Sequence, residues 1–139
     1  MTTVLDLAAP TATDDGRAFE LLARERAGFA PEEVGAVQER FVLDVKSLAA
    51  LLGVDVRTLQ RRRKRGEALT PRESSTFLAA LRVLLHGAEV FGDDEKLYRW
   101  LRRPNQSLDG EVPLELLATS TGQGLIQDTL TRIDYGVFG

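Results

Sequence analysis

The residues with the clearest capacity for chemistry in this sequence are the cations and the single amide between Val56 and Gly66. A helical turn of about 100° per residue brings four of these polar side chains to one side: Arg57, Gln60, Arg61 and Lys64. Arginine can bond both acceptors of a guanine, glutamine can read adenine in the same way, and lysine holds phosphate. The pattern therefore predicts a DNA-recognition helix, and the alternative interpretation is a basic helix exposed to solvent.

The charge of the chain is concentrated around the same segment. From Lys46 to Arg72 there are eight Lys and Arg residues and two acidic residues, a local charge of +6 in a chain of net charge −3. The rest of the chain therefore carries −9, an asymmetry that favours a localised phosphate-binding face. Arg62 and Arg63 fall nearer the inward side of the helix, so we expect them to contact phosphate or to cap the helix C-terminus.

Two short helices joined by a tight turn would position these side chains. Leu48, Leu51 and Leu52 form the apolar side of the first helix, and Ala49 is small enough for close packing. Gly53 can adopt the positive φ of the turn, and Asp55 is suited to cap a second helix from Val56 to about Arg65. Gly66 ends that helix. The segment predicts a helix-turn-helix.

Helical patterns dominate from Gly16 onward, so we expect an all-α fold. Three further helices are predicted, with these apolar faces: Phe19, Leu22 and Ala23 in Arg17 to Ala27; Val34, Val37 and Phe41 after Pro31; Phe77, Leu78, Leu81, Leu84 and Leu85 after Thr70. Thr70, Pro71 and Glu73 are typical of a helix start. Residues 1–15 lack periodic apolar positions, and we expect a frayed arm without assigned function.

The sequence offers little for catalysis. With no cysteine, disulfides, thiolate zinc sites and cysteine nucleophiles are excluded. His86, the only histidine, lies beside Gly87 at the expected end of the helix that follows Thr70. It has no neighbour at metal-ligand spacing, and we interpret it as structural. Trp100 is either a partner surface or, as we favour, a core anchor. We expect no enzyme activity, metal site or cofactor.

The composition predicts a soluble cytoplasmic protein. Hydrophobic residues make up 43% and charged residues 28% of the chain, and no apolar run approaches the ~18 residues of a membrane span. The segment from Met1 to Pro10 lacks the basic residues that precede the apolar part of a secretory signal. We expect no contact with a membrane.

The C-terminal third contains a set of residues at specific spacing: Phe91-Gly92-Asp93, Trp100-Leu101, Pro104-Asn105, Leu108, Gly110, Pro113, Leu117, Thr119, Gly122, Leu130, Ile133 and Tyr135-Gly136. In these residues it resembles the toxin-binding domain of Xre/MbcA/ParS antitoxins. Upstream, the family's Xre-type helix-turn-helix is similar in Thr58-Leu59, Arg61-Arg62, Gly66, Leu69 and Glu73-Ser74. The resemblance spans roughly residues 42 to 138. It implies a compact helical bundle with an N-terminal arm and helix (1–30), the helix-turn-helix (31–87) and a C-terminal helical toxin-binding domain (88–139).

The resemblance also implies a function in a type II toxin-antitoxin system. The partners would be a RES-domain toxin that destroys NAD, and the operator DNA of the shared operon. The family plugs the toxin's active-site entrance with its C-terminal end, which here predicts an interface at Arg132, Ile133, Asp134, Tyr135, Gly136, Val137, Phe138 and Gly139. The predicted DNA-binding residues are Arg57, Thr58, Gln60, Arg61, Arg62, Lys64 and Arg65.

We expect a homodimer, because paired helix-turn-helix units read pseudo-palindromic sites. Two alternatives stay open, one for the function and one for the aromatic tail. The alternative function is a free-standing Xre-type transcriptional regulator whose C-terminal domain dimerises or senses a ligand. For Tyr135 and Phe138, the alternative placement is an aromatic tail folded onto the protein's own core.

Overall fold

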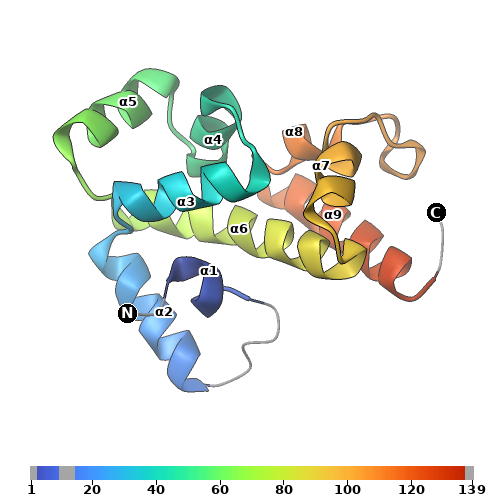
Figure 1. Ribbon diagram of the computed structural model, residues 1–139, viewed down its shortest axis with the longest axis horizontal. Coiled ribbons are helices and arrows are strands. Elements are labelled where there is room, and N and C mark those ends of the chain that lie inside the picture. Colours follow the sequence, from blue (N-terminus) through green and yellow to red (C-terminus); the bar gives the residue numbers. More distant parts are fainter. Residues whose placement is uncertain (1–2, 10–14, 137–139) are drawn as a thin grey trace.

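The computed structural model describes residues 3–9 and 15–136, and within these ranges all regular elements are helical (Figure 1). The expected all-α fold is confirmed. No helix in the described part combines the length and the apolar character that a bilayer crossing requires. The elements are α1 (Val4–Leu7), α2 (Asp15–Ala27), α3 (Pro31–Phe41), α4 (Val45–Leu52), α5 (Val56–Arg65), α6 (Pro71–Phe91), α7 (Asp94–Leu101), the 3₁₀ helix η1 (Gln106–Leu108), α8 (Pro113–Leu116) and α9 (Ser120–Asp134).

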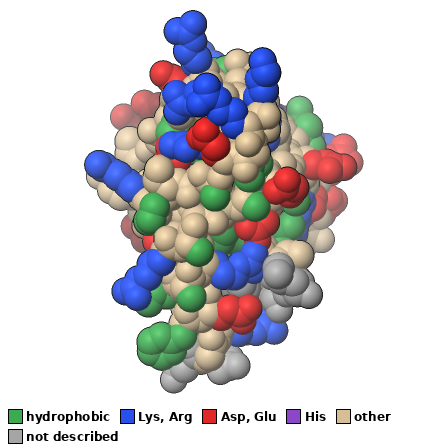
Figure 2. All heavy atoms as spheres, turned by 90° about the vertical axis from the view of Figure 1, so that its left-hand side faces the viewer, with side chains coloured by type: hydrophobic (Ala, Val, Ile, Leu, Met, Phe, Trp, Pro, Cys, Tyr) green, Lys and Arg blue, Asp and Glu red, His purple; other side chains and the backbone are tan. Residues whose placement is uncertain are grey.

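Helices α4 and α5 form the predicted helix-turn-helix. Gly53 ends α4 with φ 73°, a left-handed conformation that glycine adopts without strain. The carboxylate of Asp55 then accepts a hydrogen bond from the backbone N–H of Thr58 at 2.7 Å and caps α5, and Gly66 ends α5 with φ 64°. Figure 2 shows Lys and Arg side chains gathered at the end of the molecule where α5 lies.

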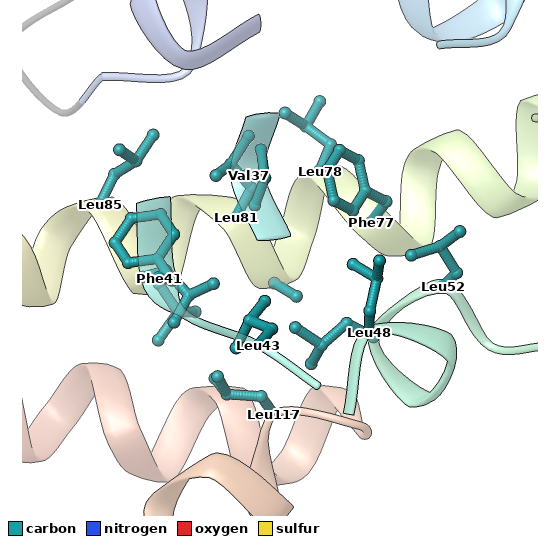
Figure 3. Packing of buried hydrophobic residues seen from close by; sticks show 14 of the residues in the cluster. Val37, Phe41, Leu43, Leu48, Leu52, Phe77, Leu78, Leu81, Leu85 and Leu117 are labelled. Atoms are coloured by element: carbon teal, nitrogen blue, oxygen red, sulfur yellow. The ribbon is translucent and has the colours of Figure 1, made fainter. Parts of the chain in front are cut away.

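The longest helix, α6, is the centre of the packing. It begins with a capping box in which Thr70 and Glu73 bond each other's backbone N–H groups. Its apolar residues meet those of α3 and α4 in one cluster, and Figure 3 shows the rings of Phe41 and Phe77 among the leucines there. Farther along, α6 packs against α7 and α9. The expected end of this helix at His86 and Gly87 is wrong, because α6 continues to Phe91. One helix therefore joins the two predicted domains, whose division stays a prediction.

The C-terminal helices pack closely because two glycines leave room. A Cβ on Gly87 of α6 would lie 2.7 Å from Cδ1 of Leu97 in α7. A Cβ on Gly122 of α9 would collide with the carbonyl group of Leu116, at the end of α8. His86 adds a polar contact between α6 and α9, because its Nδ1 donates to Oε1 of Gln127.

The N-terminal segment is more ordered than the expected frayed arm. The hydroxyl of Thr3 accepts a hydrogen bond from the N–H of Asp6, and the short helix α1 follows. Val4 and Ala8 are only 1% and 5% exposed. The prediction was wrong for these residues because a single helical turn is too short to show apolar periodicity, and its burial depends on tertiary contact with α2.

The predicted buried face of α2 was also wrong. Phe19 is 72% exposed, Leu22 and Ala23 are also exposed, and Leu21 is buried instead. The inward side carries Arg24, which forms an ion pair with Glu33 of α3. Charged residues can face a neighbouring helix when a partner neutralises them, and a pattern within α2 alone does not reveal that partner.

The approach of α9 to α8 gives a testable consequence. We expect Gly122→Ala to destabilise the fold by about 2 kcal/mol, because the new methyl group meets a backbone carbonyl that cannot turn away. Gly124→Ala in the same helix is the matched control. No atom lies within 4 Å of its Cβ position, so the substitution should stabilise the protein by about 0.5–1 kcal/mol.

Urea unfolding followed by circular dichroism measures both variants. Equal midpoints for the two substitutions would contradict the proposed close contact between α8 and α9.

Candidate DNA-binding helix and C-terminal surface

The outer side of α5 presents the polar side chains that the sequence placed there. Arg57, Gln60, Arg61 and Lys64 are all exposed, whereas Leu59 on the opposite side is 1% exposed. Arg65 is exposed at the C-terminal end of α5, and Thr58 is half-buried beside the cap. The predicted orientation of the helix is confirmed. Contact between these side chains and DNA stays a prediction.

Arg62 points the other way, into an ion-pair cluster. Its Nε forms an ion pair with Oε1 of Glu73 at 2.9 Å without a hydrogen bond. Its Nη2 donates a hydrogen bond to Oε2 of the same carboxylate at 3.0 Å. Its Nη1 also donates to Glu67 at 3.3 Å. The side chains of Arg62 and Glu73 are 15% and 12% exposed. The Arg62–Glu73 pair thus combines one hydrogen bond with a second short charge contact, and a charge-assisted hydrogen bond of this kind holds the side chain in place as well as neutralising charge.

Arg63 makes a second polar attachment. Its Nη2 donates to Oε1 of Gln38 in α3, and Nε2 of Gln38 donates in turn to the carbonyl oxygen of Leu43 at 3.0 Å. Leu59 is the only fully buried side chain of α5. Since so little apolar surface anchors α5, the bonds of Arg62 and Arg63 hold the angle at which its outer side faces solvent.

Sequence reasoning missed these attachments. The sequence predicts a place for Glu73 at the start of α6 but not its bond to Arg62, and it predicts no contact for Gln38. Their partners lie 11 and 25 residues away in sequence. The inward position of Arg62 and Arg63 on the helical wheel was the one available signal, since an inward arginine needs a partner.

Both helices of the helix-turn-helix begin with a carboxylate of lowered pKa. The backbone N–H of Thr58, and then its hydroxyl, hold the pKa of Asp55 below its usual value, and Ser47 acts in the same way on the pKa of Asp44. A lowered pKa in the folded state means that each ionised cap favours folding above the unfolded carboxyl pKa of about 4. That contribution is lost as the pH falls through the lowered value.

The predicted partner surface lies at the end of α9. Tyr135 follows the helix and is 80% exposed, and Gly136 has φ 75°. Arg132 and Asp134 are exposed and Ile133 is half-buried. The alternative that Tyr135 folds onto the core is therefore wrong. The remaining predicted interface residues, Val137, Phe138 and Gly139, lie outside the described residues.

Trp100 lies at the edge of the core. It is half-buried and packs against Phe91, with ring centroids 5.5 Å apart. Trp100 thus packs against the core, as the favoured interpretation requires, and also lines two surface hollows, so the geometry also permits contact with a partner.

The two candidate surfaces lie far apart. Figure 1 shows α5 and the end of α9 at opposite ends of the molecule, with α6 running between them. A 21-residue helix is roughly 30 Å long. One molecule can therefore present both surfaces at the same time.

Comparisons with known proteins find two family models along the chain. Residues 20–83 match the antitoxin Xre-like helix-turn-helix domain, and residues 86–136 match the antitoxin Xre/MbcA/ParS C-terminal toxin-binding domain. Antitoxin Xre of Pseudomonas putida is 30% identical over 118 residues, which are 85% of this chain and 73% of that protein. Antitoxin Xre of Yersinia enterocolitica is 29% identical over 80% of this chain and 76% of its own length.

The cluster around Arg62 predicts different effects for two arginines of the same helix. Arg62→Gln should destabilise the fold by about 2 kcal/mol, because it leaves the shielded carboxylate of Glu73 without its partner. Arg65→Gln is the control. Its pair with Glu67 is open to solvent, so its removal should change stability by less than about 0.5 kcal/mol.

Chemical unfolding in urea compares the two variants with the original protein. A loss from Arg65→Gln as large as that from Arg62→Gln would show that the Arg62–Glu73 pair has no special structural role.

Proposed function

Because the chain belongs to the Xre/MbcA/ParS family of antitoxins, with a helix-turn-helix and a toxin-binding domain, we propose that it neutralises a RES-domain toxin and represses its own operon. The toxin would be the NAD-degrading enzyme of the pair. This chain acts as a protein ligand and a gene regulator, without catalysis or a cofactor of its own.

The exposure of Tyr135 carries the proposal for toxin binding. A large aromatic side chain that is 80% exposed at a helix end is an unusual surface residue, and it suits an anchor that enters a pocket of a partner. Asp134 places a carboxylate beside it, which can meet a basic group in a pocket that binds an anionic substrate. In this mechanism residues 132–139 enter the toxin's active site and exclude its substrate.

The exposed side of α5 supports the proposal for operator binding. Arg57, Gln60 and Arg61 are placed to read base edges in a major groove, while Lys64 and Arg65 reach phosphates and the half-buried Thr58 lies at the helix start. Arg62 is the least available of the predicted contacts because Glu67 and Glu73 already hold its guanidinium.

A homodimer completes this proposal. Two copies would place two α5 helices in successive major grooves of a pseudo-palindromic operator, about one DNA turn apart. The operon would then be repressed most strongly when the antitoxin is abundant.

A triple substitution on α5 should separate DNA binding from toxin binding. Replacing Arg57, Gln60 and Arg61 by alanine should weaken operator affinity at least ~100-fold, since each lost base contact costs about 1–3 kcal/mol. Toxin binding should not change. Electrophoretic mobility shifts on the operator, and co-purification with the product of the adjacent gene, measure the two properties.

The control variant removes the same side-chain types elsewhere. Arg26→Ala, Arg82→Ala and Gln106→Ala affect exposed residues of other helices, α2, α6 and η1, and should leave operator affinity intact. If the α5 variant lost toxin binding as well, the assignment of two separate surfaces would be wrong.

Another prediction concerns neutralisation. Deleting residues 135–139 leaves α9 intact and removes the exposed aromatic end. The shortened protein should no longer suppress NAD consumption by the toxin, because the active site stays open, and it should still bind the operator. An assay of NAD loss with the toxin and increasing amounts of either protein measures the difference.

Tyr135→Phe is the matched control, since it keeps the aromatic anchor and should retain most of the inhibition. Full suppression of NAD loss by the shortened protein would contradict the active-site plug. If the complete chain failed to bind the adjacent gene product at all, the free-standing regulator would become the better hypothesis.

A further inference from the structure

Two hollows on the C-terminal part share an aromatic lining, and the smaller one lies beside the end of α9. One has a volume of about 420 Å³ and the other about 280 Å³, and Phe91 and Trp100 line both. The rings of these two residues pack against each other at 5.5 Å. We call the joined hollows the aromatic groove, defined by Phe91, Trp100 and Asn105, which line both parts.

Three cations border the larger part of the aromatic groove. Lys96, Arg99 and Arg103 are exposed, and none of them forms an ion pair with a carboxylate of the described residues. Their neighbour Arg102 differs, because it stacks on Tyr98 and donates to the carbonyl oxygen of Val42 at 2.6 Å. The cations that face the groove are thus available for an external partner, in a chain that is acidic overall.

The aromatic groove is continuous with the proposed toxin interface. Arg132 and Ile133 of α9 line its smaller part, and the exposed Tyr135 follows two residues later. A partner that receives Tyr135 in a pocket is therefore held next to the groove. Aromatic side chains at the centre of a surface, with charged residues at its rim, are typical of energetically important protein contacts.

We propose that the aromatic groove is a second docking site for the toxin and binds an acidic segment of the toxin surface. An apolar side chain of that segment packs on Phe91 and Trp100, while its carboxylates meet Lys96, Arg99 and Arg103. This inference rests on the proposed toxin partner. It divides the interface into a tail that closes the active site and a groove that supplies attraction and affinity.

The test uses charge reversal in the complete chain. Lys96→Glu, Arg99→Glu and Arg103→Glu are combined in one groove variant, and Arg17→Glu, Arg26→Glu and Arg82→Glu form the control with the same change of net charge. All six positions are exposed, so both variants should fold. The probe is the purified RES-domain protein encoded beside the gene for this chain, and its dissociation constant is measured by titration calorimetry at low and high salt.

We expect the groove variant to raise the dissociation constant at least ~30-fold at low salt, with a smaller effect at high salt, and the control to change it less than about 3-fold. A neutral variant with glutamine at the same three groove positions should show an intermediate loss. If the reversed charges disturb the fold, this glutamine variant still tests whether the three cations contribute to binding.

Other outcomes overturn the inference in distinguishable ways. If the groove variant bound the toxin normally while deletion of residues 135–139 abolished binding, the groove would have no part in docking and the antitoxin function would stand. Loss of operator affinity by the groove variant, with toxin affinity unchanged, would make the groove a nucleic-acid surface. If the original chain did not bind the toxin, the proposed function and the groove would fail together.

Discussion

The burial of α6 is the constraint on which the rest of the structure depends. Its first half packs against α2 and α4, with apolar residues of α3 in the same cluster, and its second half packs against α7 and α9. Both ends of the molecule are therefore built on one helix. Phe77, Leu81 and Leu84 are no more than 1% exposed. Burial of such side chains contributes about 1.5–3 kcal/mol each, which far exceeds the contribution of any single surface contact. The two candidate binding surfaces are therefore set by the position of the helices on α6.

Polar contacts determine the orientation of α5, which apolar burial alone does not fix. Helix α5 buries one leucine fully, and its angle depends on Arg62 and Arg63. The run of five cations from Arg61 to Arg65 thus divides into side chains that attach the helix and side chains that face solvent. A basic stretch of this length does not act as a uniform patch. In the proposed function its net charge attracts DNA, while the arginines turned inward keep the others in a fixed orientation.

The sequence was sufficient where local interactions decide the structure. Both ends of α5 and the start of α6 followed from Asp55, Gly66 and Thr70, because caps and left-handed glycines act within a few residues. The sequence was insufficient where the structure depends on a partner that is distant along the chain. The inward side of α2 depends on the Arg24–Glu33 pair. The aromatic groove combines α6, α7 and α9, so no single segment could reveal it. The exposure of α5 was predictable from periodicity, but the partners of its inward arginines were not.

The continuity of α6 has a consequence for how such a protein can change during evolution. Substitutions at residues that are well separated and share no partners add independently in their effects on free energy. The outer side of α5 and the end of α9 satisfy that condition, because they lie at opposite ends of the molecule. With the proposed function, a lineage can therefore exchange the DNA sequence that it reads without losing its match to an inherited protein partner. Duplicated copies in one genome can diverge at one end at a time, each intermediate remaining a working protein.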